Sequence, residues 1–169
     1  EDQDFVQAGG VFPVIRPKLG RVKRLVGTGG PSAETGQLLK MSKSLNNAIY
    51  LSDDPDAVKK KVMSMYTDPN RKRATDPGTV ENNPLWVFHE TFNPDTVWVQ
   101  ETEAKYRAGG VGDVDCKRKL VDVLVALIEP MRQRRLALEK DAGYVLKVLQ
   151  EGTARANVAA EETLYLAKR

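Results

Sequence analysis

The pentapeptide Lys40-Met41-Ser42-Lys43-Ser44 lies between Gly36-Gln37-Leu38-Leu39 and Leu45-Asn46-Asn47-Ala48-Ile49. It places two ammonium groups and two hydroxyl groups in one short segment. The preceding glycines predict a mobile loop rather than a helix on the approach to it: Gly27, Gly29, Gly30 and Gly36. Ammonium donors on such a loop suit the binding of phosphates whose negative charge grows during a reaction. By composition alone, the same residues also fit an ordinary solvated Ser/Lys loop.

The whole chain has the composition of a soluble globular protein. It has 169 residues, of which 41% are hydrophobic and 29% are charged. No apolar run approaches the length of a membrane span, so we expect no membrane partner. The single cysteine, Cys116, rules out an internal disulfide and favours the cytoplasm. The net charge of +3 permits a nucleic-acid partner if the basic residues cluster, but it does not require one.

The only histidine, His89, is expected to be structural. It lies in an apolar segment with Trp86, Phe88 and Phe92, at the spacing of a packed helix. Because Cys116 is the only thiol, His89 has too few partners for a zinc site. We therefore assign no metal ligands, and we interpret Cys116 as a small buried apolar residue.

The order of elements changes in character near residue 50. Short strands are expected at 11–15 and 20–27, whereas a helix start is predicted at Asp53-Asp54-Pro55. The Arg71-Lys72-Arg73 run is interpreted as a solvated loop, with a phosphate-binding role as the alternative. Further helices are expected at 85–92, 95–107 and 113–140, with a kink at Pro130, and a last helix is expected after Gly143.

The fold class is therefore mainly α, with two domains. Residues 1–50 are too few to cover both faces of a parallel sheet, so they are interpreted as the C-terminal end of a larger α/β domain. Residues 51–169 are predicted to form an antiparallel helical domain. On the long helix, a stripe of apolar side chains is expected to face the core: Leu120, Leu124, Leu127, Ile128, Met131 and Leu138. The last helix carries small and apolar residues that suggest close packing against the long helix.

Several segments together resemble the C-terminal half of a bacterial-type tryptophanyl-tRNA synthetase, a class I aminoacyl-tRNA synthetase. Lys40–Ser44 matches the family's lysine signature, and the segment from Asn47 to Asp54 follows it as in that family. Four further segments resemble the family's sequence: Glu1-Asp2-Gln3, Tyr66-Thr67-Asp68-Pro69, Asn83-Pro84-Leu85 and Gly112-Asp113-Val114-Asp115-Cys116-Lys117. The resemblance covers nearly the whole chain.

The resemblance implies the tail of a Rossmann-like catalytic domain followed by a helical bundle that binds the tRNA anticodon. It implies ATP with Mg²⁺, L-tryptophan and tRNA(Trp) as reactants, and a homodimer as the assembly. Lys40 and Lys43 would neutralise the ATP phosphates, and Ser42 and Ser44 would donate hydrogen bonds beside them, so that Lys40, Met41, Ser42, Lys43 and Ser44 form the ATP-binding segment. Glu1, Asp2 and Gln3 would lie near the ribose and Val22 against adenine, although Val22 also fits an ordinary strand position.

The chain departs from the family pattern at its beginning. The family's histidine signature and most of its tryptophan pocket are absent, and the segment from Gln3 to Phe12 is shorter than the family's. We therefore expect a C-terminal half that needs a missing N-terminal part to form the adenylate efficiently. A native product heavier than 18.8 kDa would favour this interpretation.

Two other interpretations remain open. The first is a non-catalytic tRNA- or RNA-binding module that uses basic residues of the long helix: Arg118, Arg132, Arg134 and Arg135. The second is a degenerate synthetase paralogue that acts as a protein partner. The intact lysine signature favours the enzyme, because RNA binding alone does not require it. The missing histidine signature favours the other two.

Overall fold

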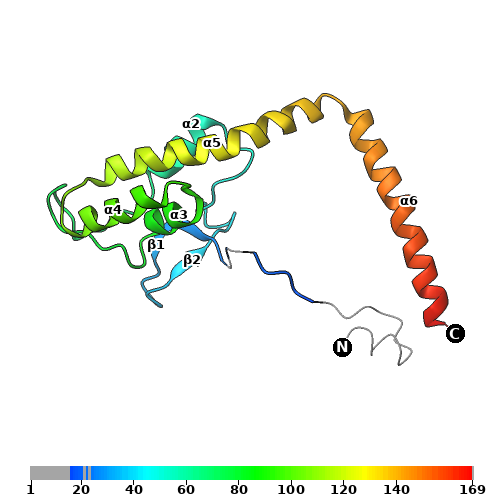
Figure 1. The fold of residues 1–169 in the computed structure, drawn as a ribbon, viewed down its shortest axis with the longest axis horizontal. Helices are drawn as coiled ribbons and strands as arrows, with labels where there is room; N and C mark the ends of the chain where they lie inside the picture. Colours follow the sequence, from blue (N-terminus) through cyan, green and yellow to red (C-terminus); the bar gives the residue numbers. More distant parts are fainter. Residues whose placement is uncertain (1–15, 21, 23, 169) are drawn as a thin grey trace. The chain divides into compact units, whose positions relative to one another are not determined.

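The structure is a computed structural model that describes residues 16–20, 22 and 24–168. In this part the chain is mainly helical, with one two-stranded sheet (Figure 1). Residues Val22–Arg134 form one compact unit, and the chain from Arg135 onwards belongs to a second unit. In chain order the elements are β1 Val26–Pro31, β2 Leu38–Lys40, α2 Pro55–Met63, α3 Pro84–Phe92, α4 Thr96–Arg107, α5 Asp113–Glu139 and α6 Ala142–Ala167.

Strands β1 and β2 form an antiparallel hairpin that ends at the lysine segment. Val26 is paired with Lys40 and Pro31 with Leu38, with an irregularity between the two pairs. At the turn, the Ser32 amide donates to the Gln37 carbonyl at 2.9 Å. Gly36 has a φ of +65°, a conformation that glycine adopts without steric cost.

The prediction that the glycine-rich approach is a loop is therefore wrong for residues 26–31, which form β1. The glycines of this strand have a packing role, because neighbouring side chains approach the backbone of β1 closely. A Cβ added at Gly27 would lie 2.2 Å from Asn47 Nδ2, and one added at Gly30 would lie 2.2 Å from Tyr66 Cδ2. These glycines leave room for side chains that lie directly on the strand.

The helix starts follow the local signals in the sequence. Asp54 is the N-cap of α2, where its carboxylate accepts from the Ala57 amide at 2.7 Å and Pro55 takes the first helical position. Asn83 caps α3 by accepting from the Leu85 amide at 3.1 Å, again with a proline directly after it. The predicted helices at 85–92, 95–107 and 113–140 correspond to α3, α4 and α5 within one residue at each end.

The core of the Val22–Arg134 unit connects the hairpin with the helices. Buried residues come from every element between β1 and α5: Val26, Leu38, Val58, Val62, Leu85, Trp86, Phe88, Tyr106, Cys116, Leu120, Leu124 and Ile128. The predicted stripe on α5 is narrower than expected, because Leu127 is 43% exposed whereas Leu120, Leu124 and Ile128 are buried. Buried apolar positions on α5 therefore recur every four residues from Cys116 to Ile128.

Helix α5 continues through Pro130 to Glu139, and α6 begins directly after the N-cap Asp141. The packing of the last helix against α5, and a domain boundary near residue 50, stay predictions. In the part of the chain that the structure describes, no helix combines the length and apolar character needed to cross a membrane.

Candidate functional site: the lysine turn

The segment Lys40–Asn46, called the lysine turn below, directly follows β2. Lys40 is the last residue of that strand, and its side chain is exposed together with those of Lys43 and Ser44. Met41 is partly buried and packs against the core. The chain is therefore anchored at Met41 while both lysine side chains face solvent, where a ligand could reach them.

Hydrogen bonds inside the lysine turn give it a defined backbone path. The Asn46 amide donates to the Lys43 carbonyl at 3.1 Å, and Asn46 has a φ of +48°. Asparagine tolerates this left-handed conformation better than most residues. The Ser42 and Ser44 hydroxyl groups lie 2.8 Å apart, so one donates to the other and one proton of the pair is left for a ligand.

Asn47 holds the start of the lysine turn, a role that the sequence analysis missed. Its side-chain carbonyl accepts from the Ser42 amide at 2.7 Å, and its side-chain NH₂ donates to the Lys40 carbonyl at 3.2 Å. Asn47 is only 8% exposed. The sequence signal is an asparagine directly after a turn and before the apolar residues Ala48 and Ile49. This signal does not show that the Asn47 side chain binds the Ser42 amide and the Lys40 carbonyl.

The remaining predicted ATP-site residues are Glu1, Asp2, Gln3 and Val22. Glu1, Asp2 and Gln3 lie outside the described residues. Val22 is 42% exposed, and its proposed contact with adenine stays a prediction.

The predicted tRNA-binding arginines lie on α5, and most of them pair with carboxylates of the same helix. Arg118 Nη1 lies 3.4 Å from Asp115 Oδ1. The two other ion pairs are Arg132–Glu129 at 2.8 Å and Arg135–Glu139 at 2.7 Å. Among the described residues, Arg134 has no such carboxylate partner.

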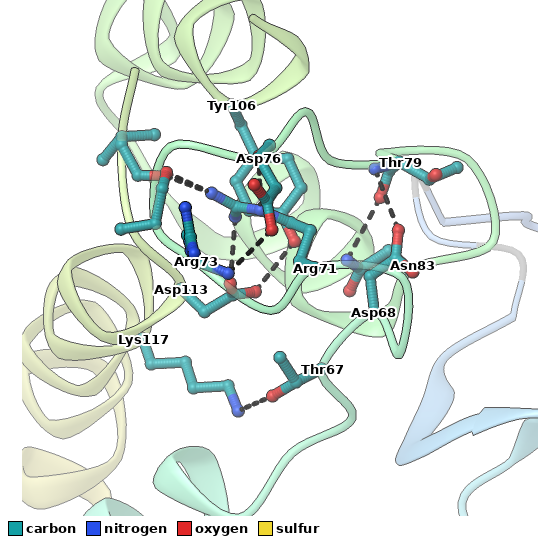
Figure 2. Close-up of polar contacts among 12 residues, drawn as sticks. Thr67, Asp68, Arg71, Arg73, Asp76, Thr79, Asn83, Tyr106, Asp113 and Lys117 are labelled. Carbon is teal, nitrogen blue, oxygen red and sulfur yellow. Dashed lines mark hydrogen bonds and ion pairs between the residues drawn. The ribbon is translucent and has the colours of Figure 1, made fainter. Parts of the chain in front are cut away.

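Arg71 is not part of a solvated loop, so this prediction is wrong for the first residue of the Arg71-Lys72-Arg73 run. Arg71 is 8% exposed, and its Nη1 forms an ion pair with Asp113 Oδ2 at 2.9 Å. It also donates to the carbonyls of Ala74, Asp76 and Val111. Figure 2 shows Arg71 at the centre of these contacts. Lys72 and Arg73 are the exposed part of the run.

Tyr106 completes the cluster around Arg71. Its hydroxyl donates to Asp113 Oδ1 at 2.8 Å, and the Arg71 guanidinium lies 4.1 Å from the centre of its ring. Burial, together with the neighbouring Asp113 carboxylate, raises the pKa of Tyr106 to about 12. The cluster joins the loop after α2 to α4 and α5, and all of its charged groups are already bound within the protein. Its contacts therefore indicate a structural role.

The prediction that His89 is structural agrees with its contacts. Its ring is fully buried, and Nε2 lies 3.0 Å from the Cys116 carbonyl. Asn93 Oδ1 accepts from the Asp95 amide, so Asn93 Nδ2 is the atom that donates to His89 Nδ1 at 3.3 Å. These contacts select the neutral ring with its proton on Nε2. Burial lowers the pKa of His89 to about 4.

Cys116 is a free cysteine whose side chain is buried in the core. Burial raises the pKa of the Cys116 thiol to about 12, as expected for an inert buried cysteine. Within the described ranges, no group of three or more His, Cys, Asp or Glu side chains is arranged to hold a metal ion.

Known proteins resemble this chain over most of its length. Tryptophan–tRNA ligase of Treponema pallidum is 46% identical over 160 residues, which cover 95% of this chain and 45% of that protein. Tryptophan–tRNA ligase of Clostridium longisporum is 46% identical over 150 residues, which cover 89% of this chain and 42% of that protein. This chain therefore spans less than half the length of these curated relatives.

A tryptophanyl-tRNA synthetase of Campylobacter jejuni, solved with ADP and tryptophan, has a TM-score of 0.71 to this chain. The similarity covers 97% of this chain and 49% of that chain at 23% identity, so it supports the fold alone. The family model described as tRNA synthetases class I (W and Y) matches residues 31–129, which is more than half of the 169 residues. The match includes β2, the lysine turn and the helices from α2 into α5, and the chain therefore belongs to this family of class I tRNA synthetases.

Proposed function

We propose that this chain is the C-terminal half of a tryptophan–tRNA ligase and that the lysine turn binds the phosphates of ATP. The observation that carries the proposal is the geometry of this turn. Lys40 and Lys43 are exposed on a backbone fixed by Met41 and Asn47, in a chain 46% identical to tryptophan–tRNA ligases. The non-catalytic RNA-binding module and the degenerate paralogue explain the helices equally well but give this turn no task.

In the proposed reaction, a carboxylate oxygen of L-tryptophan attacks the α-phosphorus of ATP. The bond from that phosphorus to the bridging oxygen breaks, and pyrophosphate leaves with the electron pair. Lys40 and Lys43 stabilise the negative charge that grows on the pyrophosphate, and the Ser42–Ser44 pair donates a hydrogen bond beside them. A ribose hydroxyl of tRNA(Trp) then attacks the tryptophanyl carbonyl, and AMP leaves.

Magnesium fits this proposal as part of the ATP substrate. Because the described residues offer no carboxylate cage, the ion would be held by phosphate oxygens and water. Its contribution is to neutralise the phosphates together with the two lysines. Contacts of Glu1, Asp2 and Gln3 with the ribose, and of Val22 with adenine, belong to the same proposal.

The remainder of the proposal concerns the whole protein. Residues 1–50 would be the end of a Rossmann-like catalytic domain, and residues 51–169 an antiparallel helical bundle that binds the tRNA anticodon through Arg118, Arg132, Arg134 and Arg135. The protein would work in the cytoplasm as a homodimer. The relatives' names support the catalytic and tRNA-binding parts of this proposal, and the mainly helical structure supports the helical domain.

The test is tryptophan-dependent exchange of pyrophosphate into ATP, measured on the complete native gene product. Lys43→Ala should lower the exchange rate about a hundredfold, because a transition-state contact is lost. The affinity for tRNA(Trp) should change little, since the lysine turn is assigned to the phosphates of ATP. Lys59→Ala, which removes an exposed lysine of α2, is the matched control and should leave exchange unchanged.

An equal loss of exchange and tRNA affinity in Lys43→Ala would contradict the assigned role. The 169-residue chain should be tested beside the complete product. We expect it to retain tRNA but to show little exchange. Full exchange by this chain would show that the ATP site does not need the family's histidine signature.

A further inference from the structure

We propose that Asn47 is a positioning residue for the ATP reaction, because its side-chain amide fixes the backbone that carries Lys40 and Lys43. This inference rests on the proposed function and adds a residue to it. The Asn47 side chain is buried. It would act through the lysine turn.

The two hydrogen bonds of the Asn47 side chain span the residue between Lys40 and Ser42. Oδ1 accepts from the Ser42 amide at 2.7 Å, and Nδ2 donates to the Lys40 carbonyl at 3.2 Å. One planar amide therefore binds an acceptor before Met41, the Lys40 carbonyl, and a donor after it, the Ser42 amide. At the end of β2, the Asn47 side chain thus makes the hydrogen bonds that a neighbouring strand would otherwise make.

Asn47 is itself held by β1. Its backbone carbonyl accepts from the Thr28 amide at 2.9 Å. Its side chain lies against Gly27, where an added Cβ would stand 2.2 Å from Nδ2 and 2.5 Å from Cγ. The position of the strand thus determines the position of the amide, and the amide determines the position of the lysine turn.

The lysine side chains depend on this backbone for their placement. Among the described residues, neither Lys40 nor Lys43 has a carboxylate partner that would orient its ammonium group. Catalysis by charge stabilisation needs the ammonium groups in place before the charge develops. Releasing the backbone at Lys40 and Ser42 should therefore slow the chemical step more than it weakens substrate binding.

The first measurement is tryptic cleavage after Lys40 and Lys43, relative to cleavage after Lys59, in the complete native gene product. Asn47→Ala should accelerate cleavage in the turn about tenfold, because local opening becomes easier. Gly27→Ala should have the same effect, since its new methyl group would displace the amide. The double variant should be cleaved no faster than Asn47→Ala, because both changes remove the same two hydrogen bonds.

The second measurement is pyrophosphate exchange, with kcat and KM determined separately. Asn47→Ala should lower kcat about tenfold or more while the KM for tryptophan stays within about twofold. Asn83→Ala is the matched control. Asn83 is a buried asparagine whose amide also binds two backbone groups, the Leu85 amide and the Thr79 carbonyl, away from the lysine turn. It should lower thermal stability without changing kcat or the relative cleavage of the turn.

The outcomes separate this inference from the function on which it rests. Absence of exchange in the unsubstituted gene product would overturn the proposed function and this inference with it. If the unsubstituted protein is active and Asn47→Ala has the same kcat as Asn83→Ala, this inference alone would be overturned. Equal relative cleavage of the turn in Asn47→Ala and Asn83→Ala would also overturn it.

Discussion

His89 should make the folded protein less stable as the pH falls from neutral towards 4. Its pKa is about 4 in the folded state, below the ordinary value of 6.5. Between these values the unfolded chain binds more protons than the folded one, so the free energy of unfolding decreases as the pH is lowered. The stabilisation is complete above pH 6.5, and its loss on approaching pH 4 amounts to about 3 kcal/mol. Protonation would also place an N–H of the ring against Asn93 Nδ2, which is a donor.

Urea unfolding at pH 7, 6 and 5 measures this effect. His89→Gln should be less stable than the unsubstituted protein at pH 7, because the replaced ring fills the core and binds the Cys116 carbonyl. The difference between the two proteins should shrink as the pH falls, since the variant has no imidazole to protonate. Parallel decreases in both proteins would assign the pH dependence to other groups.

Sequence supports a prediction about single residues where the pattern depends on neighbours in the chain. Five consecutive residues, Lys40–Ser44, carry the pattern that predicts phosphate binding, and this role stays a prediction. The burial of Arg71 could not be found in this way, because its ion-pair partner Asp113 lies 42 residues away. The role of Asn47 was hidden for a similar reason. Its two bonds are short in sequence, but they form only because Gly27 leaves space for the amide.

At the level of elements, Lys117 connects the end of α2 to α5. Its ammonium group is buried and donates to the Met65 carbonyl at 2.6 Å, the Thr67 hydroxyl at 2.8 Å and the Met63 carbonyl at 3.3 Å. Burial lowers the pKa of Lys117. Figure 2 shows its side chain extending from α5 to Thr67. The ammonium group therefore satisfies carbonyls that the end of α2 leaves without helical partners.

Lys117→Met should lower the free energy of unfolding by about 2 kcal/mol. The lost hydrogen bonds and the unpaired carbonyls outweigh the relief of no longer burying a charge. Arg118→Met removes the same charge from the next position of α5, where the side chain is 71% exposed. It should cost less than about 0.5 kcal/mol. Equal effects of the two substitutions in urea unfolding would argue against a bridge at Lys117.

Helices were predicted well and the strand was not, for a physical reason. The signals that start α2 and α3 are local: a capping Asp or Asn followed by proline. Strand β1 has the sequence Val-Gly-Thr-Gly-Gly-Pro, which by propensity alone is typical of a loop. It becomes a strand because β2 pairs with it, and because Asn47 and Tyr66 fill the space above its glycines.

At the scale of the molecule, the core of the Val22–Arg134 unit should unfold as a whole. Val26 and Leu38 of the hairpin belong to the same buried cluster as the helical core residues. Leu38→Ala should lower the free energy of unfolding by about 2 to 3 kcal/mol. Hydrogen exchange in α3 should accelerate to the same extent as in the hairpin. Leu39→Ala, at a position 43% exposed, is the matched control and should change both regions little.

Hydrogen exchange, measured by mass spectrometry on peptides covering β1, β2 and α3, shows whether the hairpin and α3 unfold together or separately. If Leu38→Ala accelerates exchange in the hairpin and leaves α3 unchanged, the hairpin is a separate cooperative unit. That result would support a domain boundary near residue 50, as the change in sequence character suggests. If exchange accelerates equally in the hairpin and α3, the two sides of residue 50 share one packed core. The change in sequence character near residue 50 would then reflect function or evolutionary origin.

The charges of α5 should determine how strongly the complete gene product binds tRNA(Trp). Glu129 partly cancels the attraction of Arg132 for phosphate, whereas Arg134 has no carboxylate partner among the described residues. Arg134→Gln should therefore weaken tRNA(Trp) binding and lower the slope of log K against log salt by about 1. Glu129→Gln should strengthen binding, because it releases Arg132. The affinity of each variant for tRNA(Trp), measured between about 50 and 200 mM salt, gives its slope of log K against log salt. If neither substitution changes the affinity or the slope, the tRNA-binding face lies on another part of the protein.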